Sequence, residues 1–356
     1  MQKNISQTLT NLKNTMNKVL IIYTGGTIGM DRNARTGALE PLQFDKLSAK
    51  MPELAQIPTA IEVYQFAPPI DSSDITPAQW SQLVKVIKEN YDDYDGFVVL
   101  HGTDTMAFTA SALSFMLENL TKPVVMTGSQ VPIGQLRTDG KENLITSIEI
   151  ASAKHEDGLP MVPEVCIYFN GRLLRGNRST KVNADGFNAF ESFNYPHLAD
   201  AGINIVYHEE YIIRPEYDKP MLSHFDLDPS VIIFTLFPGI QDIVVHHALD
   251  VPELRAIVMR SYGSGNAPQR QCLMDMLGDA SSRGINIVNV SQCAEGTVEM
   301  ARYDTGYQLK NARVISGYDS TVESAVAKLM YLQGRYSDQE IVREKMNQNL
   351  RGEISI

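Results

Sequence analysis

Two short motifs in the sequence combine glycines with hydroxyl side chains, a pattern that suits nucleophilic chemistry. The first is TGGTIGM at residues 24–30, where paired glycines let the backbone approach a ligand and Thr27 supplies a candidate nucleophile. The second is HGTDTM at residues 101–106, which opens a predicted helix whose first amides could hold an anion. A plain glycine turn and a helix cap are the alternatives for these motifs. The first motif is not a phosphate-binding loop, because no lysine follows its glycines.

Two further polar stretches could contribute to a site. DSSD at residues 71–74 is either a turn with a helix cap or a set of hydroxyls that meet a substrate carboxylate. RLLRGNRSTK at residues 172–181 is the most basic stretch of the chain. It is either a solvated loop or the segment that brings Lys181 next to a threonine–aspartate pair, where a buried lysine can lose its proton and act as a base.

The elements that would position these stretches are short apolar runs alternating with longer amphipathic segments. This alternation predicts a mostly parallel sheet covered by helices on both faces. Strands are expected at 19–23, 61–66, 97–100, 124–126 and 165–169, and helices at 77–90, 105–120 and 140–153. All four polar stretches follow a predicted strand, and open parallel sheets bind ligands beyond the carboxyl ends of their strands. We therefore expect the site in these loops.

The chain is expected to form two α/β domains. Residues 1–17 are polar and predict a flexible N-terminal extension, 18–210 form the N-terminal catalytic domain, the proline-containing stretch 211–229 is a linker, and 230–356 form the C-terminal domain. Strands are expected in the last at 231–237, 256–259 and 285–290, with helices at 242–249, 271–281 and 321–333. The predicted fold class is α/β, with a larger N-terminal, mostly parallel sheet domain flanked by helices and a smaller C-terminal α/β domain.

Composition narrows the possible partners and location. The 356 residues carry a net charge of -11, which disfavours nucleic acid and anionic membranes as partners. The three cysteines form no C-x-x-C pair, and the sequence contains no apolar run of membrane-spanning or signal-peptide length. We therefore expect a cytoplasmic protein. No cofactor or metal is expected, because the adjacent His246 and His247 would face different directions on a helix.

Longer stretches of the sequence resemble the asparaginase/glutaminase family. Besides TGGTIGM and HGTDTM, the resemblance includes DSSD at 71–74, YDDYDGF at 91–97, TGSQ at 127–130, RGNRSTK at 175–181 and RSYGSGNAP at 260–268. It covers nearly the whole chain after Lys18, and without a signal peptide it is similar to the cytoplasmic type I branch. The resemblance implies an L-asparaginase, which hydrolyses the side-chain amide of L-asparagine to L-aspartate and ammonia.

The resemblance also implies roles for individual residues. Thr27 would attack the amide and form an acyl-enzyme, and Lys181 would accept a proton through Thr103. Asp104 would complete this relay and contact the α-ammonium group of the substrate. The backbone of residues 101–104 would supply amides for the oxyanion. The residues implied to bind substrate are Asp71, Ser72, Ser73, Gly102, Thr103 and Asp104.

Two family properties reach beyond the catalytic residues. Some type I enzymes are activated by asparagine at an effector site, and the matching positions are Thr180, Arg260 and Cys293. Sigmoidal kinetics would be expected from such a site. Family members are homodimers or homotetramers, and the same is expected here.

One departure from the family concerns a catalytic tyrosine, which related enzymes often carry on the loop after the first motif. Residues 31–41 contain no tyrosine, Tyr23 lies inside a predicted strand, and Thr36 is a hydroxyl of the loop. The sequence leaves two other functions open. One is an amidase that acts on glutamine or on an amide of charged tRNA, which the acidic charge disfavours. The other is a sensor that binds amino acids without catalysis, which would have been free to lose the nucleophile or the relay.

Overall fold

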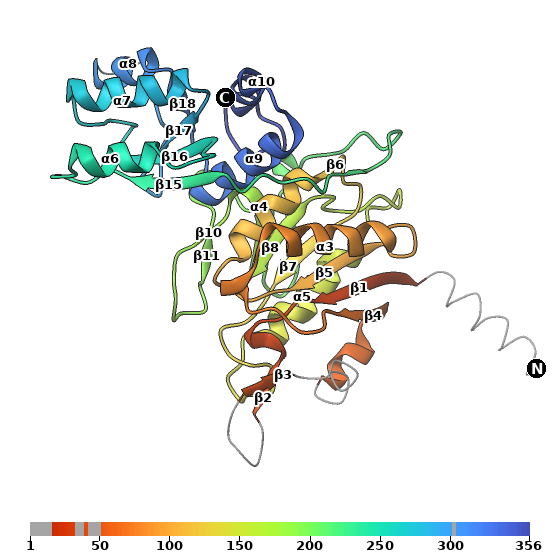
Figure 1. Cartoon of the computed structure of the whole chain (residues 1–356). Helices are drawn as coiled ribbons and strands as arrows, with labels where there is room; N and C mark the ends of the chain where they lie inside the picture. The colour runs from red at the N-terminus through yellow and green to blue at the C-terminus, as the bar shows by residue number, and fades with distance from the viewer. Residues whose placement is uncertain (1–15, 33–38, 42–50, 301–303) are drawn as a thin grey trace, which may run out of the picture.

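The computed structural model describes residues 16–32, 39–41, 51–300 and 304–356. The larger unit is built on an eight-stranded sheet with the order β13-β12-β9-β8-β7-β5-β1-β4 (Figure 1). Adjacent strands from β4 to β8 are parallel, and those from β8 to β13 are antiparallel. The parallel strands are β1 (Asn17–Tyr23), β4 (Thr59–Gln65), β5 (Gly96–Leu100), β7 (Val124–Thr127) and β8 (Val165–Phe169), and the antiparallel strands are β9 (Arg172–Arg175), β12 (Ala199–Ala201) and β13 (Ile205–Tyr207). The predicted mostly parallel sheet is confirmed.

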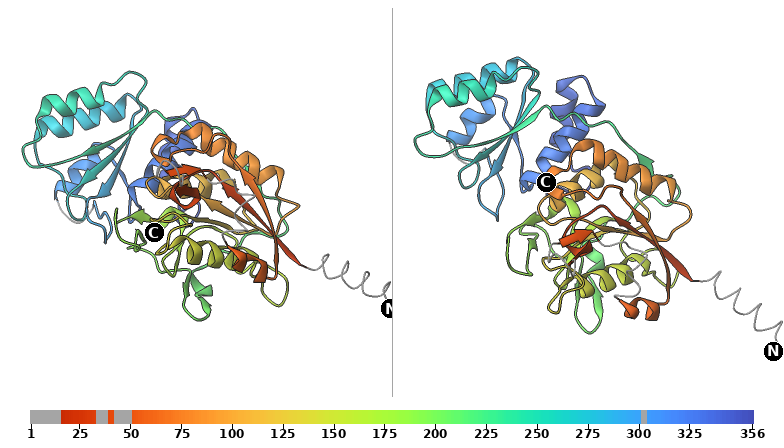
Figure 2. Two further views of the ribbon diagram at one scale, coloured as in Figure 1. Left: turned by 90° about the horizontal axis from the view of Figure 1, so that it is seen from below. Right: turned by 60° about the horizontal axis from the view of Figure 1, so that its bottom comes forward.

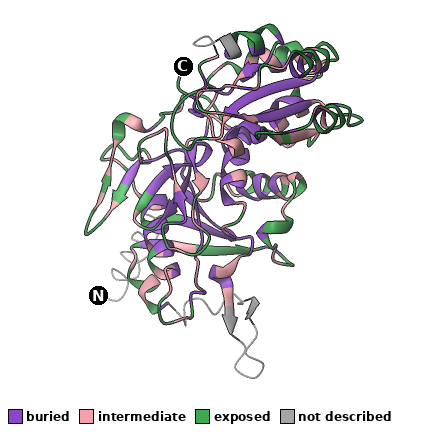
Figure 3. Ribbon diagram, turned by 90° about the vertical axis from the view of Figure 1, so that its left-hand side faces the viewer, coloured by how far each residue is buried: buried purple, intermediate pink, exposed green. Residues whose placement is uncertain are grey.

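The central strands are continuous apolar runs because both faces of the sheet are covered. Leu20 and Ile22 of β1 pack into one hydrophobic cluster with α3 (Pro77–Glu89) and α4 (Met106–Met116). Val19 and Ile21 point to the opposite face and join a second cluster with α5 (Gly140–Ser152). Successive side chains of β1 therefore point alternately into the two clusters, with the period of two that a strand has. Figure 3 shows the same strands as buried ribbons inside partly exposed helices.

The helix predicted at 105–120 is shorter in the structure, because α4 ends at Met116. The next two residues form β6 (Leu117–Glu118), which pairs with β14 (Leu222–Ser223). Asn119 then takes a positive φ of 56° and donates from Nδ2 to the backbone oxygens of Glu216 and Lys219. The chain leaves the helix early because it pairs with residues about a hundred positions further on, which apolar periodicity does not report.

The smaller unit is a parallel four-stranded sheet in simple sequence order. Its strands are β15 (Val231–Thr235), β16 (Ala256–Ser261), β17 (Asn286–Ser291) and β18 (Ile315–Ser316). Its helices are α6 (Asp242–Leu249), α7 (Gln271–Ser282) and α8 (Asp304–Asn311). The smaller C-terminal α/β unit is therefore as predicted.

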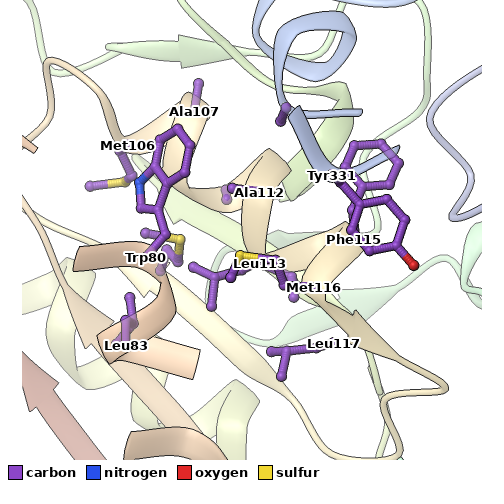
Figure 4. Close-up of a cluster of buried hydrophobic side chains, with 14 of the residues drawn as sticks. Trp80, Leu83, Met106, Ala107, Ala112, Leu113, Phe115, Met116, Leu117 and Tyr331 are labelled. Atoms are coloured by element: carbon purple, nitrogen blue, oxygen red, sulfur yellow. The ribbon is translucent and has the colours of Figure 1, made fainter. Parts of the chain in front are cut away.

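Two further helices, α9 (Val322–Arg335) and α10 (Gln339–Met346), lie at the junction of the two units (Figure 2). The Tyr331 ring of α9 stacks on Phe115 of α4 with ring centroids 6.0 Å apart (Figure 4). Apolar residues of β16, β17 and α9 belong to the same cluster as α3 and α4. One of the hydrophobic clusters therefore continues across the junction of the two units.

The remaining strands are short and lie outside both large sheets. β2 (Met30–Arg32) pairs with β3 (Leu39–Pro41), and β10 (Thr180–Lys181) pairs with β11 (Phe190–Glu191). The predicted N-terminal extension lies almost wholly outside the described residues, since the description begins at Met16. Thr36 also lies outside them.

Candidate active site

The candidate site lies where the strand order of the large sheet changes direction. The chain runs from β1 outward to β4 and then crosses to β5 on the other side of β1. Loops after such neighbouring strands diverge and leave a crevice for ligands. The loop after β1 carries Thr27 and the loop after β5 carries Thr103, so both motifs reach the same point.

Glycines allow these loops to touch. Gly26 has φ 90°, and a Cβ atom placed there would lie 2.5 Å from the Gly102 nitrogen. A Cβ on Gly102 would in turn lie 2.4 Å from Ser72 Oγ. A side chain at either glycine would therefore push the loops apart. The contact places Thr27, the residue after Gly26, beside the HGTDTM loop and Ser72.

Hydrogen bonds fix the three loops to one another. Thr24 donates from both its amide and its hydroxyl to Leu100 O, at 3.0 and 2.9 Å. The Ile70 amide donates to Thr24 O at 2.7 Å. Thr105 Oγ1 donates to Ser72 O, also at 2.7 Å. Positions around Thr27 are thus set by the backbone, which gives the rigid placement that a catalytic group requires.

Lys181 reaches this point from β10. Its Nζ atom donates to Thr103 Oγ1 at 2.9 Å and to Asp104 Oδ1 at 2.7 Å. Lys181 is half-buried and Asp104 is exposed. The lysine, threonine and aspartate proposed from sequence therefore meet, although Lys181 stands 77 positions after Asp104.

Gln130 is a residue of the site that the sequence analysis did not single out. Its Oε1 atom accepts from Thr103 Oγ1 at 3.3 Å, and its Nε2 atom donates to Gly186 O at 3.1 Å. Its backbone amide donates to the carboxylate of Asp139. Gln130 follows β7, so the rule that directed attention to loops after parallel strands applies to it as well.

The 71–74 stretch forms a 3-10 turn whose N-cap is Asp71. The Asp71 carboxylate accepts from both the amide and the hydroxyl of Ser73, each at 2.9 Å, and these bonds hold the Asp71 pKa below its ordinary value. An ionised carboxylate repels a substrate carboxylate, so Asp71 suits the shaping of this loop. Ser72, buried against Gly102, is the member that lies closest to the other loops.

Tyr23 lies directly beneath the turn that carries Thr27. Its side chain is fully buried, and a Cβ on Gly29 would lie 2.5 Å from its hydroxyl oxygen. Burial raises the Tyr23 pKa to about 12, so the phenol stays protonated at neutral pH. Burial therefore disfavours the phenolate form that a base for Thr27 would need.

His101 is also sealed beneath the catalytic loops. Its Nδ1 atom lies 2.7 Å from Gly102 O, and its Nε2 atom lies 3.0 Å from Thr109 Oγ1, which also accepts from Trp80 Nε1. Burial lowers the His101 pKa to about 4. The imidazole is therefore neutral. Its hydrogen is on Nδ1, which donates to the Gly102 carbonyl oxygen.

Two of the three candidate effector residues converge on Glu323 at the start of α9. Thr180 Oγ1 donates to Glu323 Oε1 at 2.6 Å. Burial raises the Glu323 pKa, and the charge of Arg260 opposes this rise. Arg260 Nε is buried and has no hydrogen-bond partner among the described residues. Cys293 is exposed, and its amide donates to Ser291 Oγ.

Two kinds of feature are absent from the described part of the chain. No group of three or more histidine, cysteine, aspartate or glutamate side chains there is arranged to hold a metal ion. None of its helices has the length and apolar character needed to cross a membrane.

Comparisons with known proteins agree with the geometry. The family model described as Asparaginase, N-terminal, matches residues 18–212, and the model described as Glutaminase/Asparaginase C-terminal domain matches residues 230–346. L-asparaginase 1 of Escherichia coli strain K12 is 45% identical over 339 residues, covering 95% of this chain and 98% of that protein. The human 60 kDa lysophospholipase is 39% identical over 95% of this chain and 61% of that protein.

Solved structures give the same result. L-asparaginase I from Vibrio cholerae superposes with a TM-score of 0.87 at 43% identity, covering 96% of this chain and all of that one. The thermostable L-asparaginase from Thermococcus kodakarensis gives a TM-score of 0.84 at 33% identity, over 95% and 99% of the two chains. The two family models together span most of the sequence, and the chain therefore belongs to the asparaginase family of amidohydrolases.

Proposed function

We propose that this protein is an L-asparaginase that converts L-asparagine to L-aspartate and ammonia through an acyl-enzyme on Thr27. The observation that carries the proposal is the contact of Lys181 with Thr103 and Asp104 beside the touching glycines of the two motifs. A hydroxyl nucleophile needs a nearby base, and this arrangement supplies one through a single intervening hydroxyl.

The proposed proton route starts from these contacts and adds one transfer, between Thr103 and Thr27. Neutral Lys181 takes the proton of the Thr103 hydroxyl, and Thr103 takes that of Thr27 as the Thr27 oxygen bonds to the amide carbon. The carbon–nitrogen bond then breaks, and ammonia leaves with a proton returned along the same route. Water repeats the attack on the ester and releases aspartate. Amides of residues 101–104 would stabilise the tetrahedral oxyanion.

Lys181 must be neutral to act as a base, yet it is ion-paired with Asp104 in the absence of substrate. The α-ammonium group of asparagine would bring a second positive charge to Asp104. Two cations that share one carboxylate repel each other, so a bound substrate would weaken the ion pair between Lys181 and Asp104. The exposed Asp104 side chain leaves room for such a contact.

The test is ammonia release from L-asparagine and L-glutamine by the wild type, by Thr27→Ala and by Thr235→Ala. Thr235 is an exposed threonine of β15 in the smaller unit and provides a matched control. We expect release from asparagine by the wild type and by Thr235→Ala, and a loss of at least about 1000-fold in Thr27→Ala. Folded wild-type protein that releases ammonia from neither amide would overturn the proposal. It would then favour the sensor, with the missing loop tyrosine as the first suspect.

We also propose that asparagine activates the enzyme at an effector site formed by Thr180, Arg260 and Cys293, with Glu323 as a further member that contacts Thr180. Arg260 has a buried, unused donor for a carboxylate, and Glu323 offers an acceptor for an ammonium group. Cys293 is included from the family resemblance. Sigmoidal dependence of rate on asparagine in the wild type, and hyperbolic dependence in Thr180→Ala, are the expected results. Hyperbolic kinetics in the wild type would exclude the effector site.

We further expect a homodimer or homotetramer, which light scattering would test.

A further inference from the structure

The hairpin that presents Lys181 is too short to be stable by itself. Thr180 pairs with Glu191 and Lys181 pairs with Phe190, and these are the two pairs of the β10–β11 ladder. Even longer isolated two-stranded hairpins are marginal in water. The position of Lys181 therefore depends on side-chain contacts between this hairpin and the rest of the protein.

Several residues of the hairpin make these contacts. Thr180 Oγ1 donates to Glu323 Oε1 of α9 at 2.6 Å. The Phe190 ring lies 5.2 Å from the Phe169 ring at the end of β8, and Gly186 O accepts from Gln130 Nε2. A further contact is made by the Glu191 carboxylate. It accepts from Arg172 of β9 at 2.5 Å and from the Ser192 amide at 3.1 Å. Glu191 thus ties the hairpin to β9 of the large sheet.

His197 extends this tie in an unusual way, because both of its ring nitrogens face carboxylates. Nε2 lies 3.2 Å from Glu191 Oε1, and Nδ1 lies 3.0 Å from Asp200 Oδ1 in β12. A neutral imidazole carries one N–H and can donate only one of these bonds, whereas an imidazolium ion donates both. The arrangement is therefore complete only when His197 is protonated.

The five side chains form a row of alternating charge along the sheet edge. The row consists, in this order, of Arg172, Glu191, His197, Asp200 and His208. At its end, His208 Nε2 lies 2.9 Å from Asp200 Oδ2. Partial burial raises the pKa of Glu191, but the Ser192 amide, His197 and Arg172 outweigh it and leave that pKa below its ordinary value. The pKa of Asp200 is likewise held low, because His208 and His197 outweigh the effect of burial. Both carboxylates are therefore ionised at neutral pH.

We infer that Glu191 is a positioning residue for Lys181, and that its hold on the β10–β11 hairpin is complete only while His197 is protonated. This inference rests on the proposed function, in which Lys181 is the base. Glu191 of β11 and Asp200 of β12 face His197 directly, and Arg172 and His208 act on it through them.

Loss of a proton from His197 breaks one of its two carboxylate bonds. His197 loses this proton as the pH rises, so the hold weakens in that direction. A looser hairpin lengthens the contacts of Lys181 with Thr103 and Asp104. Turnover then falls more than substrate affinity, because Lys181 moves the proton and does not itself bind the substrate in the proposed mechanism.

The experiment measures kcat and KM for asparagine from pH 5.5 to 8.5 in wild type, Glu191→Gln, His197→Gln and Glu340→Gln. Glu340 is the matched control, because it accepts from Arg313 at 2.6 Å in an exposed ion pair between α10 and the smaller unit. At pH 6 we expect kcat of Glu191→Gln and His197→Gln to be lower by about 5-fold with KM nearly unchanged. Above pH 8, where the wild type has lost its own His197 bond, the deficit of His197→Gln should disappear. The deficit of Glu191→Gln should shrink but persist, because Arg172 still holds Glu191 in the wild type.

A second measurement separates this inference from the proposed function. The NMR signal of the Lys181 ε-carbon, assigned by its absence in Lys181→Met, should shift between pH 6 and 8 in the wild type but not in Glu191→Gln. That result supports the inference even in a protein that does not hydrolyse asparagine. Wild-type kcat in Glu191→Gln at pH 6 with an unchanged Lys181 signal would overturn it. An equal loss of kcat in Glu340→Gln would also overturn it, since the effect would then be general destabilisation.

Discussion

Two lysine–carboxylate pairs show how the same chemistry serves different purposes in the two regions. Lys181 and Asp104 are 2.7 Å apart, and the Asp104 side chain is 66% exposed. Lys328 and Glu353 are 2.6 Å apart, with side chains 2% and 0% exposed. The first pair lies at the carboxyl edge of the large sheet, and the second joins α9 to the end of the chain. The two pairs therefore have nearly the same nitrogen–oxygen distance and differ in how far their side chains are exposed to solvent.

The two lysine–carboxylate pairs also differ in how many hydrogen bonds their polar atoms already make within the protein. Lys328 also donates to the backbone oxygens of Met346 and Gln348, and Glu353 accepts from the amides of Leu350 and Arg351. The sealed pair therefore has no capacity for a ligand. It fixes a tail whose Gly352 oxygen accepts from Arg178, three residues before Lys181. The buried pair supports folding, and the accessible pair remains available for chemistry.

The largest expected effect comes from removing the accessible lysine. Lys181→Met should lower kcat for asparagine by about 1000-fold, because it removes the proposed base. Its free energy of unfolding should change by less than about 1 kcal/mol, since Asp104 stays solvated. Ammonia release and urea denaturation on the same preparation check both parts. A loss of several kcal/mol in stability would show that this pair, too, supports the fold.

Removing the sealed lysine should have the opposite pattern. Lys328→Met leaves the Glu353 carboxylate buried without a counter-ion and should lower the free energy of unfolding by about 3–5 kcal/mol. Burial lowers the pKa of Lys328, and Glu353 opposes this effect. Adding Glu353→Gln to Lys328→Met removes the orphaned charge and should restore part of the stability. If the double variant is less stable than Lys328→Met, the unpaired charge is not the cause.

Most of the candidate active site could be predicted from the sequence. The apolar runs that became β1 and β5 are unmistakable because both faces of these strands are buried. Motifs directly after them had to emerge at the same sheet edge. Lys181 was the harder assignment, because β10 has only two residues and no apolar pattern. The place of its loop after the strand at 165–169 made this position one alternative, and the family resemblance favoured it over a solvated loop.

Residues that act through tertiary contacts could not be predicted in this way. Glu323 lies on α9, whose periodicity predicted a helix but not its contact with Thr180, 143 positions earlier. The antiparallel strands β9, β12 and β13 are short and mixed in polarity, so they carry no clear period of two. Lys328 lies on an apolar helix face, and only the returning tail supplies its partner.

An intermediate effect on stability is expected for His101, which is buried like Lys328 but lies beneath the catalytic loops. Its pKa falls from 6.5 to about 4 on folding, so the unfolded chain binds more protons between these values. This contribution to stability is complete above pH 6.5 and is lost as the pH falls toward 4. Stability in the wild type should drop by up to about 3 kcal/mol from this source.

The difference between wild type and His101→Gln isolates this histidine, because other groups titrate equally in both proteins. Urea unfolding at pH 7, 6, 5 and 4.5 should give curves whose separation changes steadily as the pH falls. Parallel curves would mean that His101 gains a proton in the folded protein as readily as in the unfolded chain, and hence that the layer beneath Gly102 admits water.

The smallest effect is expected for a fully accessible pair. Lys85 and Glu89 stand one turn apart on α3, with Nζ and Oε1 separated by 3.8 Å and side chains 66% and 61% exposed. Lysine precedes glutamate, the less favourable order along a helix. Glu89→Gln should therefore change the free energy of unfolding by less than about 0.5 kcal/mol, and 1 M salt should remove the difference. A salt-resistant loss near that of Lys328→Met would break the comparison, since exposure would no longer separate pairs that hold the fold from pairs that do not.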